Sequence, residues 1–121
     1  MPAAYSLPCR PVFLKAVRTL TLAALIPVLP TLAADEAAQM ALGKKLFSQG
    51  AVPACAVCHT LRDAGAAGAI GPVLDDLQPN AARVAQALRM GIGQMPSYKD
   101  KLSEDQILAL SLYVATSSGA K

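Results

Sequence analysis

Two cysteines and a histidine stand together in the run Cys55-Ala56-Val57-Cys58-His59. Two thiols three positions apart can form thioethers with the two vinyl groups of one porphyrin, and the side chain that follows then lies over the iron. This C-x-x-C-H run is the sequence signature of c-type haem attachment. We therefore predict one haem c, bound covalently through Cys55 and Cys58, with His59 as an iron ligand.

The same residues have two other chemical interpretations, a zinc site and a thiol redox centre. Structural zinc needs four ligands, and Cys9 is the only further cysteine or histidine in the sequence. A thioredoxin-like centre would need strands on either side of a helix, but residues 45–75 contain no strand-like runs of Val, Ile and aromatic residues. Haem attachment is therefore the favoured interpretation.

The second axial position of the iron needs a ligand or stays open. His59 is the only histidine, so the exported chain offers the methionines Met40, Met90 and Met95. Met95 stands in residues 91–96, where glycines allow the backbone to approach the porphyrin closely and proline stiffens the turn. We predict that Met95 is the second ligand; its alternative role is simple packing, which is also the role expected of Met40 and Met90.

The N-terminal segment has the pattern of a secretory signal peptide. Residues 1–33 contain an apolar stretch at 20–29, small residues near its end, no acidic residue, and three basic ones, Arg10, Lys15 and Arg18. We predict cleavage after Ala33 or Ala34 and export to the periplasm. The alternative, an uncleaved membrane anchor, is disfavoured because the apolar stretch is short and contains Pro27.

The exported chain has a balanced charge. The full sequence has 11 Lys and Arg against 8 Asp and Glu, and three of the basic residues lie in the signal segment. Removal of this segment leaves 8 basic and 8 acidic side chains, and ionised haem propionates would add about two negative charges. Because no basic excess remains, we exclude nucleic acid as a partner.

The rest of the chain has helical rather than strand-like periodicity, which predicts an all-α fold. The first helix is expected from an N-cap at Asp35 to about Ser48, and a second over residues 80–90. The last should begin at a capping box formed by Ser103 and Gln106 and run to about Thr116. We expect a short helical turn after His59, followed by a loop of small residues at 63–72 that wraps the haem edge.

Residues 34–121 would form one small domain with a thin core. Its aromatic side chains are Phe47, Tyr98 and Tyr113. A haem in the centre would supply the missing apolar surface. We therefore expect the chain to fold poorly without haem.

Taken in order, these features resemble the class I cytochrome c family over nearly all of residues 34–121. Gly43 and Phe47 match first-helix positions of the family, and Gly71-Pro72 and Met95-Pro96 match its two haem-flanking segments. The resemblance implies N- and C-terminal helices that cross and pack around one haem. It also implies that the Pro72 carbonyl accepts a hydrogen bond from the ligand histidine, and it supports Met95 as the distal ligand.

The same resemblance implies a function: one-electron transfer in the periplasm by a protein that is not itself an enzyme. The Gly-Ala loop and the GIGQMPSY segment are similar to those of small cytochromes that take electrons from periplasmic dehydrogenases, including sulfite dehydrogenases. The acceptor would be an oxidase or another cytochrome, and the protein a monomer or a member of transient complexes. Two alternatives stay open: a tightly bound haem subunit of a dehydrogenase complex, and a haem peroxidase, which would need an open distal position.

The sequence also departs from the family. It has no tryptophan to bond a haem propionate, and the stretch between Pro72 and Met95 is short. Arg83, Tyr98 and Lys99 are the candidate propionate donors, and the sequence does not choose among them.

Overall fold

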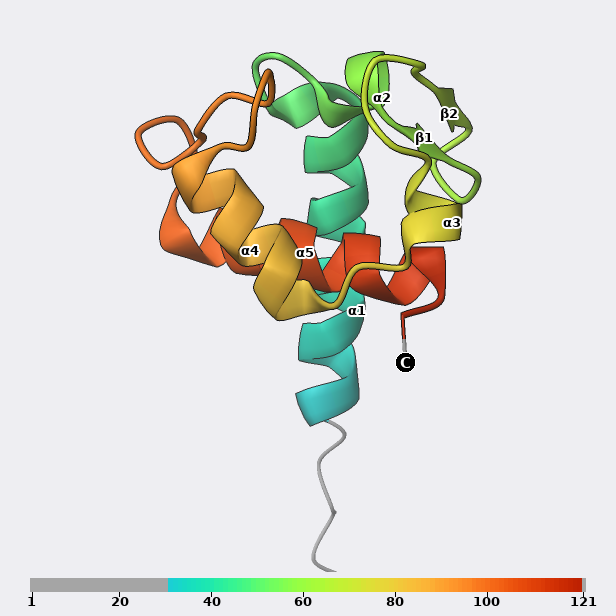
Figure 1. The fold of residues 1–121 in the computed structure, drawn as a ribbon. Helices are drawn as coiled ribbons and strands as arrows, with labels where there is room; N and C mark the ends of the chain where they lie inside the picture. The colour runs from blue at the N-terminus through green and yellow to red at the C-terminus, as the bar shows by residue number, and fades with distance from the viewer. Residues whose placement is uncertain (1–30, 121) are drawn as a thin grey trace, which may run out of the picture.

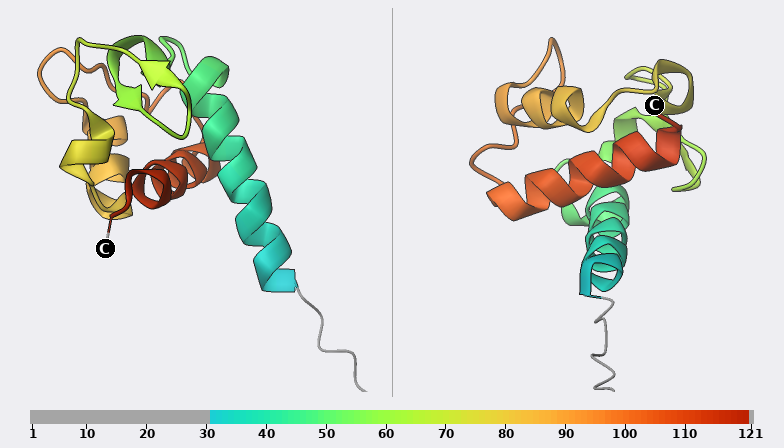
Figure 2. Two further views of the ribbon diagram at one scale, coloured as in Figure 1. Left: turned by 90° about the vertical axis from the view of Figure 1, so that its right-hand side faces the viewer. Right: turned by 90° about the horizontal axis from the view of Figure 1, so that it is seen from below.

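Helices α1 (Thr31–Lys45) and α5 (Glu104–Ser118) cross one another in the centre of the fold (Figures 1 and 2). The structure is a computed structural model and describes residues 31–120. Gly43 lies at the crossing, where a Cβ atom would overlap the main-chain oxygen of Ala109 and the Cβ of Tyr113. The absence of a side chain therefore allows the two helices to touch, and the ring of Phe47 packs edge-on against that of Tyr113 with 6.0 Å between centroids.

Helix α1 begins earlier than the sequence indicated. The prediction of an N-cap at Asp35 is wrong, because the helix already includes Thr31 and runs through Ala33 and Ala34, which have the highest helix propensity of any residue type. At its other end α1 continues as a π-helix, η1 (Leu46–Gly50). Of the predicted signal segment, residues 1–30 lie outside the described residues, so its removal stays a prediction.

The two C-terminal helices begin where the sequence predicted. Helix α4 (Ala81–Met90) is capped by Asn80, whose side chain accepts from the Arg83 amide at 2.9 Å. At the start of α5, Ser103 accepts from the Gln106 amide at 3.2 Å, and the Gln106 side chain accepts from the Ser103 amide at 2.9 Å. This reciprocal pair confirms the capping box, although α5 extends two residues beyond the expected end, to Ser118.

The segment around the cysteines differs from expectation. The short helix, α2 (Cys55–Cys58), precedes His59 instead of following it, and two short strands come next, β1 (Thr60–Leu61) and β2 (Ala66–Ala67), paired antiparallel. The predicted helical turn after His59 is therefore wrong. Gly65 adopts a positive φ of 62°, and this closes the tight turn that returns the chain alongside itself.

One further helix was not predicted, the single turn α3 (Leu74–Leu77). It ends because Gln78 takes a left-handed conformation, and Asp75 on it accepts from the Arg62 amide at 2.9 Å. Apart from the short β1–β2 ladder, the regular elements of residues 31–120 are helices, which confirms the all-α prediction. Among the helices of residues 31–120, none has the combined length and apolar character that a membrane span requires.

Candidate functional site

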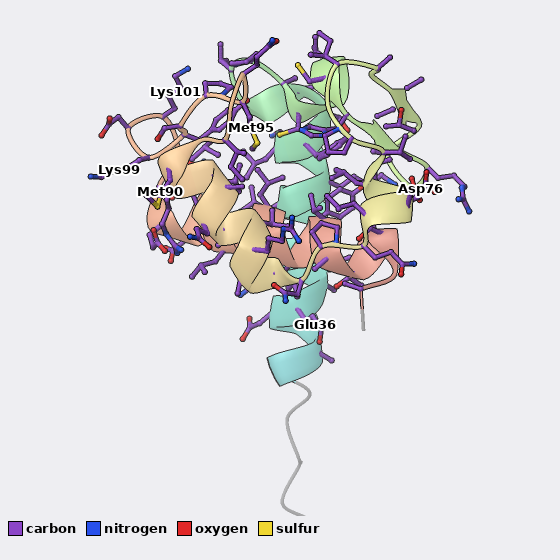
Figure 3. The ribbon with its side chains drawn as sticks, in the orientation of Figure 1. Glu36, Asp76, Met90, Met95, Lys99 and Lys101 are labelled. Atoms are coloured by element: carbon purple, nitrogen blue, oxygen red, sulfur yellow. The ribbon has the colours of Figure 1, made fainter. Side chains whose placement is uncertain are left out.

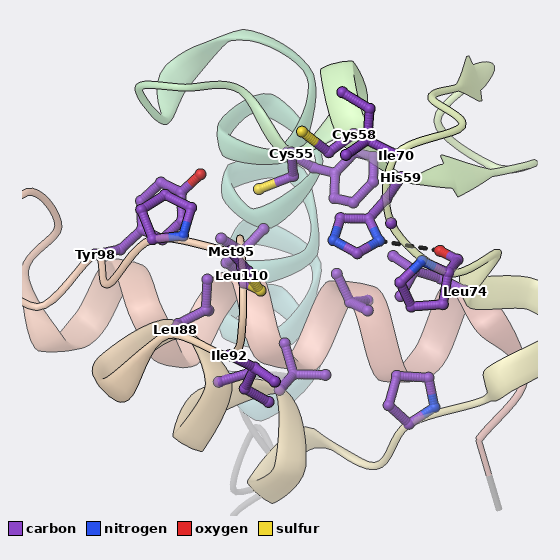
Figure 4. A pocket seen from close by; sticks show the side chains of 18 of the residues that line it. Cys55, Cys58, His59, Ile70, Leu74, Leu88, Ile92, Met95, Tyr98 and Leu110 are labelled. Carbon is purple, nitrogen blue, oxygen red and sulfur yellow. Dashed lines mark hydrogen bonds between the residues drawn. The ribbon is translucent and has the colours of Figure 1, made fainter.

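A cavity of about 630 Å³ lies in front of the α1–α5 crossing, between the loop of Met95 and the segment that follows the cysteines (Figure 4). Its volume falls within the range of roughly 300–1,000 Å³ that is usual for cofactor pockets. The walls are mostly aliphatic, aromatic and proline side chains from η1, α3, α4, α5 and the loops between them, among them Phe47, Leu74, Leu88, Leu110 and Val114. The helices thus surround an apolar space that the protein's own side chains do not fill.

His59 projects into this cavity from one wall. Its Nδ1 lies 3.0 Å from the carbonyl oxygen of Pro72. A carbonyl can only accept, so Nδ1 carries the proton and donates, which leaves the lone pair of Nε2 free to bind a metal. The Gly71 backbone also lies against this ring, which it can do only without a side chain, because a Cβ on that residue would lie 2.7 Å from Nδ1.

The two cysteines lie at one edge of the cavity, both presented by the single turn α2 (Figure 4). Cys55 is buried, and burial raises the pKa of its thiol to about 11. A thiol held in its protonated form is a poor ligand for zinc and a poor nucleophile for disulfide exchange. Within residues 31–120 no group of three or more Cys, His, Asp and Glu side chains could hold a metal ion. The raised pKa of the Cys55 thiol argues against a thiol redox centre, and the missing further ligands among these residues argue against a zinc site.

Met95 lies in the wall across the cavity from His59 (Figure 4). Its amide donates to the carbonyl of Ile92 at 2.9 Å, and the Ile92 amide donates back to Met95 at 3.1 Å. Gly93 closes this tight loop with a positive φ of 58°. The loop therefore has the defined conformation needed to aim one side chain at the cavity.

The other two methionines of residues 31–120 lie elsewhere. Met90 is 73% exposed and points away from the cavity, near the outer end of α4 (Figure 3). Met40 packs from α1 against the hydrophobic core and does not line the cavity. Of the three sequence candidates, only Met95 lines the cavity that also contains His59.

The three candidate propionate donors differ in their positions relative to the cavity. Among residues 31–120, Arg83 is the only Lys, Arg, Asp or Glu residue that lines the cavity. Tyr98 also lines it, but its hydroxyl donates to the Pro53 carbonyl at 2.7 Å. Lys99 is exposed and does not line the cavity. Arg83 is thus the one cavity residue whose charge could compensate a carboxylate.

The residues present fit a haem. One edge of the cavity carries two thiols, opposite walls carry an imidazole and a thioether, and the lining between them is apolar. A porphyrin needs an apolar body, iron ligands above and below its plane, and a cation near its carboxylates. The described residues provide each of these in one cavity.

Sequence reasoning missed two contributions to the site. Gly68 was taken only as a member of the loop of small residues, yet a Cβ on Gly68 would lie 2.6 Å from the His59 amide nitrogen. Main-chain amides of Ile70 and Gly71 also donate to the Cys58 carbonyl, at 3.1 and 2.8 Å. The bond from Tyr98 to Pro53 was missed as well, since nothing in the sequence relates residues 45 positions apart.

Comparisons with known proteins place this chain beside others of known type. The sequence model of the family described as "Cytochrome C oxidase, cbb3-type, subunit III" matches residues 38–114, which include every residue that lines the cavity. The crystal structure of the c-type cytochrome SorU from Sinorhizobium meliloti is similar, with 45% sequence identity and a TM-score of 0.66. The alignment covers 69% of this chain and 95% of SorU. No curated protein sequence matches the chain.

Proposed function

Because the chain belongs to the class I cytochrome c family, in the group described by the cbb3-type model, we propose that it carries electrons on a haem ligated by His59 and Met95. Membership of the family itself makes it a monohaem electron carrier with one covalently bound haem c. The observation that carries the ligand proposal is that His59 and Met95 lie in opposite walls of one apolar cavity whose edge holds Cys55 and Cys58.

The haem supplies the chemistry, a change of one electron at the iron. The protein's residues do the rest. Pro72 and Gly71 hold the His59 ring in one orientation, with the proton on Nδ1 and the lone pair on Nε2. The aliphatic lining excludes water, and a thioether at the second position favours the ferrous state. If His59 and Met95 both hold the haem, no substrate would need to bind for an electron to pass.

We propose that the chain works in the periplasm after removal of residues 1–33. Its donor would be a periplasmic dehydrogenase, of which a sulfite dehydrogenase is our first candidate, and its acceptor an oxidase or another cytochrome. The apolar side chains Val57, Ile70 and Ile92 are exposed, and Ile70 and Ile92 also line the cavity. They support brief docking of a redox partner near the haem site. Small contacts of this kind are typical of transient redox encounters.

A carrier role is favoured over a peroxidase by one observation. A peroxidase needs an iron position that peroxide can reach, whereas the Met95 side chain occupies the wall facing His59. The family is generally non-enzymatic, and the geometry gives no reason to propose a reaction beyond electron transfer.

The ligand proposal is tested by exchange of Met95 for alanine in the haem-loaded protein. Ferric haem with a sulfur ligand has a weak far-red charge-transfer band, and we expect Met95→Ala to abolish it. The matched control is Met90→Ala, which removes an exposed methionine five residues away and should leave the band unchanged. If the band survives in Met95→Ala and disappears in Met90→Ala, the proposed ligand is wrong.

A further inference from the structure

The segment that follows Met95 is tied to the segment that precedes Cys55. Tyr98, three residues after Met95, is only 3% exposed, and its hydroxyl donates to the carbonyl of Pro53 at 2.7 Å. Pro53 stands two residues before Cys55. One side chain therefore spans from the loop on one wall of the cavity to the attachment turn at its edge.

A second side chain reinforces this connection. The Lys101 ammonium donates to the carbonyl of Val52 at 3.1 Å and lies 5.7 Å from the centre of the Tyr98 ring. Two neighbouring carbonyls, those of Val52 and Pro53, thus accept from two side chains of one short segment. The bond from Lys101 is exposed and contributes little by itself, so the buried tyrosine carries most of the connection.

The main chain of this segment is anchored on its other side to α4. The Tyr98 amide donates to the Leu88 carbonyl at 2.7 Å, and the Ser97 hydroxyl donates to the Arg89 carbonyl at 2.7 Å. Residues 92–96 lie between this anchor and the end of α4, and Ile92, Gly93, Gln94 and Pro96 are all exposed. The two hydrogen bonds between Ile92 and Met95 are internal to the loop, so the bonds at Tyr98 and Ser97 attach its C-terminal end to the rest of the fold.

We propose that Tyr98, assisted by Lys101, is a positioning residue that keeps the Met95 loop closed over the second axial position of the iron. The inference rests on the proposed ligation by Met95. Loss of the Tyr98 hydroxyl leaves the Pro53 carbonyl without its donor and removes a restraint that exists only while the loop is closed. The open loop then becomes more populated, and an added ligand can reach the iron more often.

The experiment compares two tyrosine-to-phenylalanine exchanges in the haem-loaded protein. Tyr98→Phe removes the hydroxyl at the loop. Tyr113→Phe is the matched control, because its hydroxyl also makes one 2.7 Å hydrogen bond, to Asp63, but it does not line the cavity. The measurements are the affinity of the ferric protein for imidazole, the thermal loss of the far-red band, and the thermal loss of helix by circular dichroism.

We expect Tyr98→Phe to bind imidazole roughly threefold to tenfold more tightly, which corresponds to the loss of one hydrogen bond. Its far-red band should disappear at a lower temperature than its helical signal. Tyr113→Phe should lose helix earlier but bind imidazole as the wild type does. A Lys101→Met variant should show a smaller gain in imidazole affinity than Tyr98→Phe.

The proposal is overturned if the two tyrosine variants bind imidazole equally, or if the band and the helical signal of Tyr98→Phe disappear together. Failure of the underlying ligation has a different signature. In that case the wild type would lack the band or Met95→Ala would retain it, whatever Tyr98→Phe shows.

Discussion

The Nδ1–H of His59 donates to the carbonyl oxygen of Pro72 at 3.0 Å, across 13 residues of chain. The intervening residues form the β1–β2 ladder and then return past the imidazole, so that Gly71 lies against the ring just before Pro72 accepts its hydrogen bond. Orientation of the imidazole thus depends on the path of this short segment, and the first prediction tests that dependence.

Gly71→Ala should disturb the site because the added Cβ would overlap the His59 ring. We expect a loss of about 1–3 kcal/mol in the free energy of unfolding, typical of overpacking, and a weakened or shifted ferric spectrum. The control is Gly65→Ala, where the new Cβ meets no atom within 4 Å and only the positive φ is costly. Gly65→Ala should lose about 1 kcal/mol and keep the wild-type spectrum. Equal spectral changes in both variants would contradict the steric explanation.

Arg83→Gln should lower the reduction potential, because Arg83 is the one charged side chain of the cavity and a nearby positive charge favours the reduced iron. Arg83 is exposed, so we expect the exchange to change the free energy of reduction of the haem by less than about 1 kcal/mol. Protein-film voltammetry at low ionic strength measures it. Arg62→Gln, at an exposed arginine outside the cavity, is the control and should change the potential less. An unchanged potential in Arg83→Gln would argue against a contact with the propionates.

Asp63 should make stability depend on acid pH. The hydroxyl of Tyr113 and the ammonium of Lys44, at 2.7 and 3.1 Å, lower the pKa of Asp63 below its ordinary 3.8. The carboxylate therefore stabilises the fold above the unfolded-state pKa, and this contribution disappears as the pH falls through the lowered folded-state pKa. Half-exposed pairs are screened, so the contribution stays within about 1 kcal/mol.

The measurement for Asp63 is thermal unfolding of Asp63→Asn and of wild type between neutral pH and acid. The difference in melting temperature should be largest at neutral pH and shrink in acid. Asp76→Asn, which removes an exposed carboxylate on α3, serves as the control. A difference that persists undiminished at the lowest pH would show that Asp63 acts by packing and not by its charge.

The double variant Cys55→Ala, Cys58→Ala should lose most of its helical structure. Without covalent haem the apolar cavity of about 630 Å³ would be left without its filling, and small domains have little core to compensate. Circular dichroism of the exported chain measures the helix content. A cooperative thermal transition in haem-free protein would contradict the view that the cofactor is part of the core.

The sequence by itself determined the chemistry of this protein. The spacing of Cys55, Cys58 and His59 is a local property, because adjacent residues stay adjacent in any fold. Local rules also sufficed for the capping box at Ser103, since capping involves residues within three positions of each other. They did not suffice at Asp35, where the preceding alanines extend the helix past the expected cap.

Tertiary structure decided which residues surround that chemistry. In the folded chain Met95 lines the cavity, whereas Met90 is exposed outside it. Arg83 is the charged residue among the described residues of the cavity, and Tyr98 donates a hydrogen bond to Pro53. Tertiary structure also placed Gly71 against His59, and formed strand β1 where a helical turn was expected and strand β2 within the expected loop. These relationships depend on where distant parts of the chain meet. No periodicity or spacing encodes such meetings, because they follow from how η1, α4, α5 and the loops between the helices pack around one cavity.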